Sequence, residues 1–172
     1  PYFKGVDWSR TRAYTMGLGG LYLNLKGREA QGTVKPGAEA EALKKELAAK
    51  LRNLRDEEQD AIAIRTVYPT NSLYRGPYLA EAPDLIVGYD EGYRTSWDAA
   101  VGKVTAAVFE NNDKAWSGDH SVDPVLVPGV LFSNRKFDAD NPGIEDLAPT
   151  VLDLFGVERP AWMEGTPIYK TA

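Results

Sequence analysis

The sequence predicts a fold of the α/β class. Apolar residues recur at helical spacing within residues 38–55, and residues 144–155 carry a second helical pattern. Two short runs, 61–68 and 84–89, are instead rich in the aliphatic, β-branched and aromatic residues that are typical of strands. Because strands alternate with helices along the chain, we expect a sheet with helices packed on it.

The first predicted element is a pair of short strands within residues 13–25. This stretch mixes aromatic and aliphatic residues around Gly17, Gly19 and Gly20, which is typical of two strands joined by a glycine turn. The glycines do not match a dinucleotide-binding fingerprint, and a tight turn explains them better. A loop through residues 27–37 follows.

The predicted helix at residues 38–55 has a single apolar stripe. Its leucines recur at spacings of four, four and three residues, at Leu43, Leu47, Leu51 and Leu54. Glutamates and lysines lie between them, so we expect one face of this helix to pack on a core and the other to meet water.

Three further elements are predicted downstream. The run 84–89 is almost continuously apolar, as expected for a strand covered on both faces. Residues 127–133, with the sequence VPGVLFS, are predicted as another strand. Residues 144–155 are predicted as a helix that Gly156 ends, and Pro149 within it either begins the helix proper or interrupts it.

Composition excludes several classes of function. With 172 residues, of which 43% are hydrophobic, the chain can bury one compact core. Its net charge of −5 disfavours a role in coating nucleic acid or anionic membranes. The absence of cysteine excludes disulfides, Cys-ligated zinc and thiol catalysis. No apolar run reaches the roughly 18 residues of a membrane-spanning helix, so we expect a soluble chain with no membrane partner.

The chain has one histidine, His120, in a polar segment that precedes residues 127–133. Loops of this kind commonly present functional side chains, although a lone loop histidine is more often a hydrogen-bonded surface residue. Without a second histidine, a zinc site built from this chain alone would consist mostly of carboxylates, which is unusual for zinc. The nearby acidic residues Asp113, Asp119 and Asp123 equally suit the capping of turns.

Three arginines stand where anions or substrates can bind. Arg28 lies beside Glu29 between glycines, and a local ion pair between the two explains this arrangement more simply than a ligand does. Arg75 and Arg94 lie beside tyrosines, which fits a substrate wall or stacked surface rings.

Gly118, His120 and Asp123 are spaced as Gly-x-His-x-x-Asp. This pattern resembles Gly-x-His-Gly-Tyr-Asp-Asn, which holds the last metal-binding histidine in the type I phosphodiesterase and nucleotide pyrophosphatase branch of the alkaline phosphatase superfamily. The chain departs from it at Ser121, which stands in place of the glycine after the histidine. Residues 6–29 are also similar to members of this superfamily.

The C-terminal part resembles the closing helix of the same branch, Ile-x-Asp-x-x-Pro-Thr-x-Leu-x-Leu with Phe or Leu and Gly after it, followed by a proline and Met-x-Gly. The matching residues are Ile144, Asp146, Pro149, Thr150, Leu152, Leu154, Phe155, Gly156, Pro160, Met163 and Gly165. The two motifs cover about residues 116–168. We therefore interpret residues 1–172 as the C-terminal segment of a phosphohydrolase catalytic domain.

The resemblance implies part of a three-layer sandwich with a central mixed sheet flanked by helices. It also implies a site with two divalent metal ions, usually zinc, to which this chain contributes His120 as a ligand and Asp123 as a residue that fixes the ligand loop. The nucleophile and the other metal ligands have no counterpart here, so no catalytic residue carries over. We expect the missing N-terminal half of the catalytic domain to be the partner, and this chain alone to be inactive and to bind zinc weakly.

The implied substrate is a small phosphorylated molecule with a phosphodiester, pyrophosphate or phosphomonoester bond, although the substrate-binding residues are not identified. Because such a segment leaves strand edges and apolar surface unpaired, we also expect it to favour a homo-oligomer. Two other hypotheses stay open. One is a non-catalytic binding or scaffold module that uses the loop of residues 73–97. The other is a sulfatase or phosphomutase of the same superfamily, since the elements that set the substrate lie outside these residues.

Overall fold

The computed structural model describes residues 2–115, 118, 121–137 and 139–169. The chain forms two compact units, Pro1–Pro128 and Gly129–Ala172. Its helices and strands make it a mixed α/β protein, so the predicted class is confirmed at that level.

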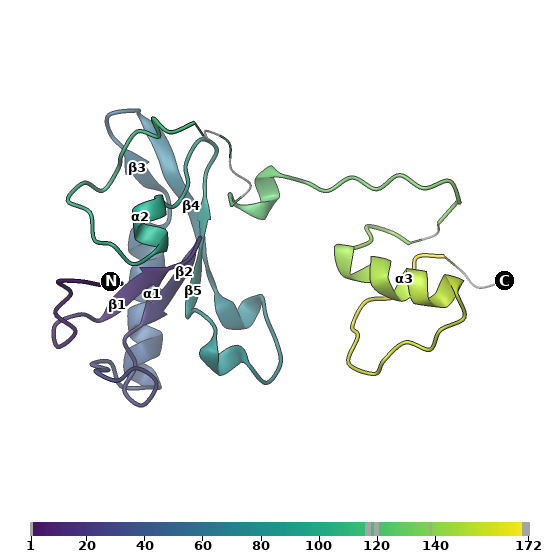
Figure 1. Cartoon of the computed structure of the whole chain (residues 1–172), viewed down its shortest axis with the longest axis horizontal. Helices are drawn as coiled ribbons and strands as arrows, with labels where there is room; N and C mark the ends of the chain where they lie inside the picture. Colours follow the sequence, from purple (N-terminus) through teal and green to yellow (C-terminus); the bar gives the residue numbers. More distant parts are fainter. Residues whose placement is uncertain (1, 116–117, 119–120, 138, 170–172) are drawn as a thin grey trace. The chain divides into compact units, whose positions relative to one another are not determined.

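A five-stranded sheet forms the centre of the first unit, with the strand order β1-β2-β5-β4-β3 (Figure 1). The strands are β1 (Ala13–Met16), β2 (Gly20–Leu23), β3 (Leu54–Asp56), β4 (Ala61–Pro69) and β5 (Leu85–Tyr89). All four pairings between them are antiparallel, so these strands do not form the mixed sheet that the resemblance implied. The short connections explain two of these antiparallel pairings. Residues 17–19 join β1 to β2 and residues 57–60 join β3 to β4, and both turns are too short for the crossover that parallel strands require.

The first strand pair follows the sequence prediction closely. β1 and β2 form a hairpin in which Ala13 pairs with Leu23 and Met16 pairs with Gly20. Gly17 adopts a φ of 76° in the turn, a conformation that favours glycine. The interpretation of these glycines as a tight turn is therefore confirmed.

The core lies between helix α1 (Ala38–Leu51) and one face of the sheet (Figure 1). Its buried side chains come from α1, from three strands and from the loop that precedes α1. They are Leu21, Leu23, Val34, Ala40, Leu43, Ile64, Val67, Leu85 and Val87. The apolar stripe of the predicted helix thus faces the core, as expected.

The predicted helix extends too far at its C-terminal end. It begins at Ala38 as predicted but ends at Leu51, because Arg52 turns to extended backbone and Asn53 adopts a φ of 58°. Leu54 then begins β3, where it pairs with Ile64. The pairing with β4 therefore outweighs the helical preference of the last four predicted residues.

The opposite face of the sheet carries the residues that alternate with the core positions, among them Tyr22, Thr66, Tyr68, Ile86 and Gly88. Near the β1–β2 hairpin an aromatic cluster covers part of this unit. It consists of Phe3, Trp8, Tyr14 and Tyr22, with ring centroids between 5.3 and 5.5 Å apart. Helix α2 (Trp97–Ala100) lies against β1, and Gly17 donates its N–H to the Ala100 carbonyl at 3.0 Å.

The strand predicted at residues 127–133 does not form. The chain there follows the short 3-10 helix η3 (Pro124–Leu126), and Val130 and Phe132 are 84% and 91% exposed. Pro128 has no N–H to give to a ladder, and Gly129 weakens a strand further. The apolar composition of this run therefore does not produce a strand within the described residues.

In the second unit, the 3-10 helix η4 (Ile144–Asp146) leads into helix α3 (Leu147–Leu154). Pro149 is the third residue of α3, within the first turn, where a missing N–H costs little. Gly156 follows the helix with a φ of 63°. The predicted helix and its end at Gly156 are thus confirmed.

The tail of the second unit is held by two side chains, one from η4 and one from α3. Asp146 accepts the N–H groups of Gly143 at 2.8 Å and Thr166 at 2.7 Å, and Thr150 accepts the N–H of Ile168 at 3.0 Å. Two of the residues that match the closing motif therefore hold the segment after the helix in place.

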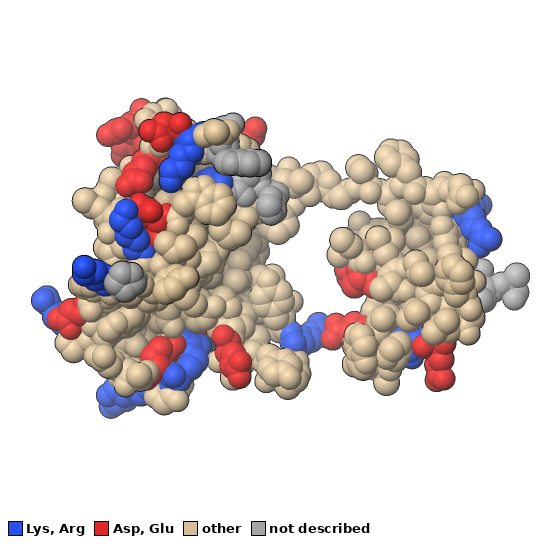
Figure 2. Space-filling view, viewed as in Figure 1, with Lys and Arg blue, Asp and Glu red and all other residues tan. Residues whose placement is uncertain are grey.

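Acidic and basic side chains are interspersed on the face of the molecule that Figure 2 shows. None of the helices in the described residues is both long enough and apolar enough to span a bilayer.

Candidate functional site

The segment that carries the predicted site returns to the C-terminal end of strand β5. Asp123 donates its backbone N–H to the carbonyl of Tyr89, the last residue of β5, at 2.9 Å. Its side chain is fully buried, with 0% exposure, against Gly88. One carboxylate oxygen also accepts the N–H of Val125 at 3.1 Å and so caps η3. The turn-capping interpretation of Asp123 is therefore realised.

Tyr68, on strand β4, is the main partner of this carboxylate. Its hydroxyl donates to Asp123, at 3.0 and 3.2 Å from the two oxygens. Burial raises the pKa of the Tyr68 phenol, the bond to Asp123 raises it further, and the nearby charges of Arg65 and Arg52 lower it. A buried carboxylate requires such partners, because an uncompensated charge is costly away from water.

Sequence reasoning missed Tyr68. Alternation along β4 places Thr66 and Tyr68 on the face opposite Val67, and that alternation was readable in the sequence. The partner of Tyr68, however, lies 55 residues further along the chain. No local spacing links the two.

His120 and Asp119 lie outside the described residues. Of the other acidic candidates, Asp113 is exposed and Asp123 is held as described above. The expectation that His120 binds a metal therefore stays a prediction, as does the role of Asp123 in fixing its loop.

Arg28 forms the ion pair predicted with Glu29, and it does more. Its Nε donates to Glu29 at 2.7 Å, while one Nη donates to Asp84 at 2.7 Å and to the Leu23 carbonyl at 2.8 Å. The bonds to Asp84 and Glu29 raise the pKa of Arg28 although burial lowers it. Asp84 in turn accepts the N–H of Leu23 at 2.7 Å. This network fastens β2 to the residue that precedes β5.

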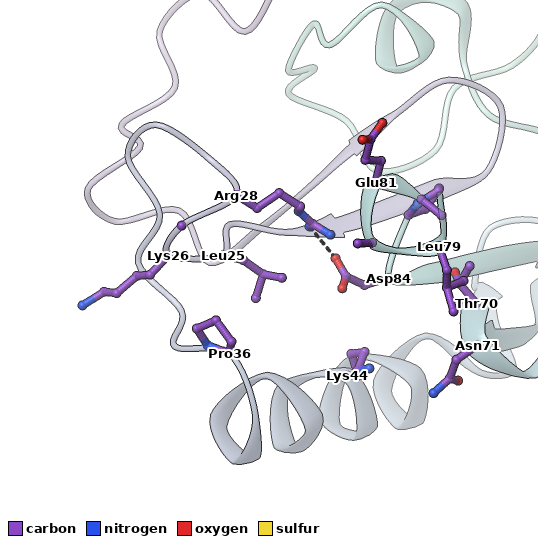
Figure 3. A pocket seen from close by; sticks show the side chains of 14 residues that line it. Leu25, Lys26, Arg28, Pro36, Lys44, Thr70, Asn71, Leu79, Glu81 and Asp84 are labelled. Carbon is purple, nitrogen blue, oxygen red and sulfur yellow. Dashed lines mark hydrogen bonds and ion pairs between the residues drawn. The ribbon is translucent and has the colours of Figure 1, made fainter. Parts of the chain in front are cut away.

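A pocket of about 660 Å³ opens beside this network (Figure 3). In Figure 3 the Arg28 side chain reaches toward Asp84 across one wall, and Lys44 of α1 stands on the opposite side. Lys44 is paired with Glu41 at 2.6 Å. Two cations of this pocket, Arg28 and Lys44, are thus paired with carboxylates of the chain itself.

The arginines beside tyrosines are surface groups. Arg75 is exposed, and the guanidinium of Arg94 lies 4.4 Å from the centroid of the Trp97 ring. Stacking on a surface ring therefore describes Arg94. The exposed tyrosines of the same loop are Tyr74 and Tyr78, with 52% and 77% exposure.

Within the described part of the chain, no group of three or more His, Cys, Asp or Glu side chains is arranged to hold a metal ion. A protein zinc site normally uses three or four such ligands.

Comparisons of the chain with models of known families, with curated proteins and with solved structures find no match.

Proposed function

We propose that this chain is the C-terminal part of a metal-dependent hydrolase that cleaves a phosphodiester, pyrophosphate or phosphomonoester bond. In this proposal His120 is one ligand of a site with two divalent metal ions, with zinc as the expected metal. The remaining ligands and the nucleophile come from the N-terminal half of the catalytic domain. Such ions polarise the phosphoryl group and stabilise the attacking and departing oxygens.

The observation that carries the proposal is the anchoring of Asp123. A segment whose spacing resembles a metal-binding motif is joined to the C-terminal end of strand β5 by the Asp123 N–H, and its buried carboxylate binds Tyr68. A ligand loop needs such pinning, because a metal site tolerates little displacement of its donors. Asp123 and Tyr68 are therefore proposed as positioning residues.

The finer part of the fold prediction belongs to this proposal. The five-stranded sheet has α1 on one face, and part of its other face carries partly exposed side chains such as Thr66 and Ile86. In a three-layer sandwich, further helices would cover that second face. We propose that the N-terminal half supplies them, together with the additional strands of a larger sheet.

The test is the hydrolysis of a chromogenic phosphodiester by this chain together with the polypeptide encoded upstream of Pro1. We expect zinc-dependent activity that His120→Ala reduces at least about 100-fold, because changes to groups that only support a ligand already cost 10 to 100-fold. Arg55→Gln is the matched control, since Arg55 pairs with Asp60 at the surface. Circular dichroism establishes that each variant is folded.

Equal activity of the His120→Ala variant and the unchanged chain would contradict the proposal. Loss of bound zinc in that variant, measured by metal analysis, supports the role of His120 independently of turnover. A chromogenic sulfate ester run in parallel separates the sulfatase alternative from the phosphohydrolase.

A non-catalytic binding module is the second candidate function. The exposure of Tyr74 and Tyr78 favours it, because exposed aromatic side chains are enriched where proteins recognise partners. If this candidate holds, Tyr78→Ala abolishes partner binding while His120→Ala leaves it unchanged. The opposite pattern favours the hydrolase.

A further inference from the structure

A second pocket, of about 520 Å³, opens beside Asp123. The residues that matter in its lining are Arg52 and Asn53, which follow α1, Arg65 and Tyr68 of β4, and Asp90 and Asp123. Two arginines and an amide thus line the same pocket as the best-anchored residue of the candidate site.

The two guanidinium groups have spare hydrogen-bonding capacity. Arg65 approaches the Asp90 carboxylate at 3.6 Å, which is longer than a hydrogen bond, and its side chain is 46% exposed. Arg52 is exposed, and within the described residues its guanidinium has no hydrogen bond or ion pair. Both arginines line the pocket together with Tyr68, and both lower the pKa of its phenol against the effects of burial and of Asp123.

The acidic residues of the pocket are already engaged. Asp123 is fully buried, accepts the Tyr68 hydroxyl and caps η3, so it does not turn toward an arginine. Asp90 accepts the N–H of Glu91 at 2.8 Å. The lining thus presents the donors of Arg52, Arg65 and Asn53, and an anion there competes with the Asp90 carboxylate only for Arg65, which Asp90 holds at 3.6 Å.

In the pocket beside Arg28, two cationic side chains are held more tightly. There the guanidinium is committed to Glu29, Asp84 and the Leu23 carbonyl, and Lys44 is paired with Glu41. An anion that binds Arg28 or Lys44 in that pocket would have to displace carboxylates. An anion entering the pocket of Arg52 and Arg65 displaces none held at hydrogen-bond distance.

We propose that Arg52, Arg65 and Asn53 form an anion-binding site for a phosphate group. Guanidinium suits this ligand because its planar fork donates two parallel hydrogen bonds to phosphate oxygens. The identity of the ligand rests on the proposed function: the site takes an additional, non-reacting phosphate of the substrate.

The experiment measures binding of inorganic phosphate to the 172-residue chain by calorimetry, in the presence of a chelator and at constant ionic strength. We expect saturable binding that Arg52→Gln and Arg65→Gln each weaken about tenfold, the loss expected for one hydrogen bond to a charged group. Arg65→Lys retains part of the affinity. Arg55→Gln, whose arginine lies on β3 outside this pocket, leaves binding unchanged.

Two results would overturn the inference: absence of saturable phosphate binding, or binding that the double substitution of Arg52 and Arg65 leaves intact. A folded state for each variant is established by circular dichroism. Because no metal is present in this measurement, its outcome is separate from the dependence of hydrolysis on His120. If the chain binds phosphate through these arginines but shows no hydrolysis that depends on His120 when it is combined with the polypeptide encoded upstream of Pro1, the hydrolase proposal fails and the anion site stands.

Discussion

Replacing Arg28 with alanine is predicted to destabilise the first unit by about 2–3 kcal/mol. The substitution removes the donors to Glu29, Asp84 and the Leu23 carbonyl. Breaking a fully buried ion pair costs about 3–5 kcal/mol, because the partner charge stays uncompensated. The side chains of Glu29 and Asp84 retain 14% and 12% exposure, so water partly solvates the orphaned carboxylates and reduces that cost.

Backbone N–H donors further reduce the cost of leaving the two carboxylates without Arg28. Glu29 keeps the N–H of Leu25 at 2.7 Å, and Asp84 keeps the N–H of Leu23 at 2.7 Å. The expected loss is nevertheless a large part of the roughly 5–15 kcal/mol by which a domain is stable. It should therefore be plain in a denaturation curve.

The assay is urea unfolding followed by tryptophan fluorescence. Trp8 is a suitable probe, because its ring lies 5.3 Å from the Tyr14 ring, and the Tyr14 hydroxyl donates to Glu29. Arg55→Ala is the matched control. The Arg55 side chain is 44% exposed and that of its partner Asp60 is 91% exposed, and such surface ion pairs contribute about 0–1 kcal/mol to stability. If Arg28→Ala and Arg55→Ala unfold within about 0.5 kcal/mol of each other, the reasoning is refuted.

Three further predictions concern titration and packing. Burial and the neighbouring Glu29 raise the pKa of Tyr14 to about 12. The folded state therefore holds the phenol proton more tightly, and this contribution to stability is lost as the pH rises from 10.0 toward 12. The difference in absorbance between the unchanged chain and Tyr14→Phe should show one phenol that ionises late, and a phenol that ionises at the ordinary pH would contradict the prediction. The N–H groups of Thr166 and Gly143 lower the pKa of Asp146 below its ordinary 3.8, so stability of the second unit falls as pH drops from above 3.8 through the lowered folded pKa. Amide exchange should detect that fall in the unchanged chain and a smaller one in Asp146→Asn. Gly88→Ala puts a methyl group 2.5 Å from the Asp123 carboxylate and should cost about 1–3 kcal/mol, whereas Gly118→Ala meets nothing within 4 Å and should be neutral in the same urea assay.

The sequence predicted correctly those elements whose ends are set by a few adjacent residues. The glycine turn of the first hairpin, the start of α1 and the end of α3 at Gly156 each follow from a few adjacent residues. The end of α1 did not, because Leu54 continues the helical spacing of leucines but is taken by β3 through its pairing with Ile64. Apolar periodicity identifies a buried face and leaves open which neighbour buries it.

Long-range polar contacts were the least predictable part. Asn24 is fully buried and donates to the carbonyls of Trp8, Thr11 and Gln31, which joins the segment before β1 to the loop after β2. Nothing in the composition around Asn24 distinguishes it from a surface residue. The same holds for Tyr68 and Asp123, whose contact spans 55 residues.

Three of the residues that match the closing motif of the phosphohydrolase branch are explained by folding, so their presence says little about function. Asp146 and Thr150 bind the backbone of the tail, and a side chain on Gly165 would meet the Glu145 carbonyl at 2.0 Å, so the folding of the second unit explains all three. Any chain that closes with this turn would select the same residues, whatever reaction it served. The phosphohydrolase proposal is therefore carried by the segment of His120 and the anchoring of Asp123, and not by the closing helix. For that reason His120→Ala is the decisive substitution, since changes within residues 144–165 would lower stability whether or not the chain belongs to an enzyme.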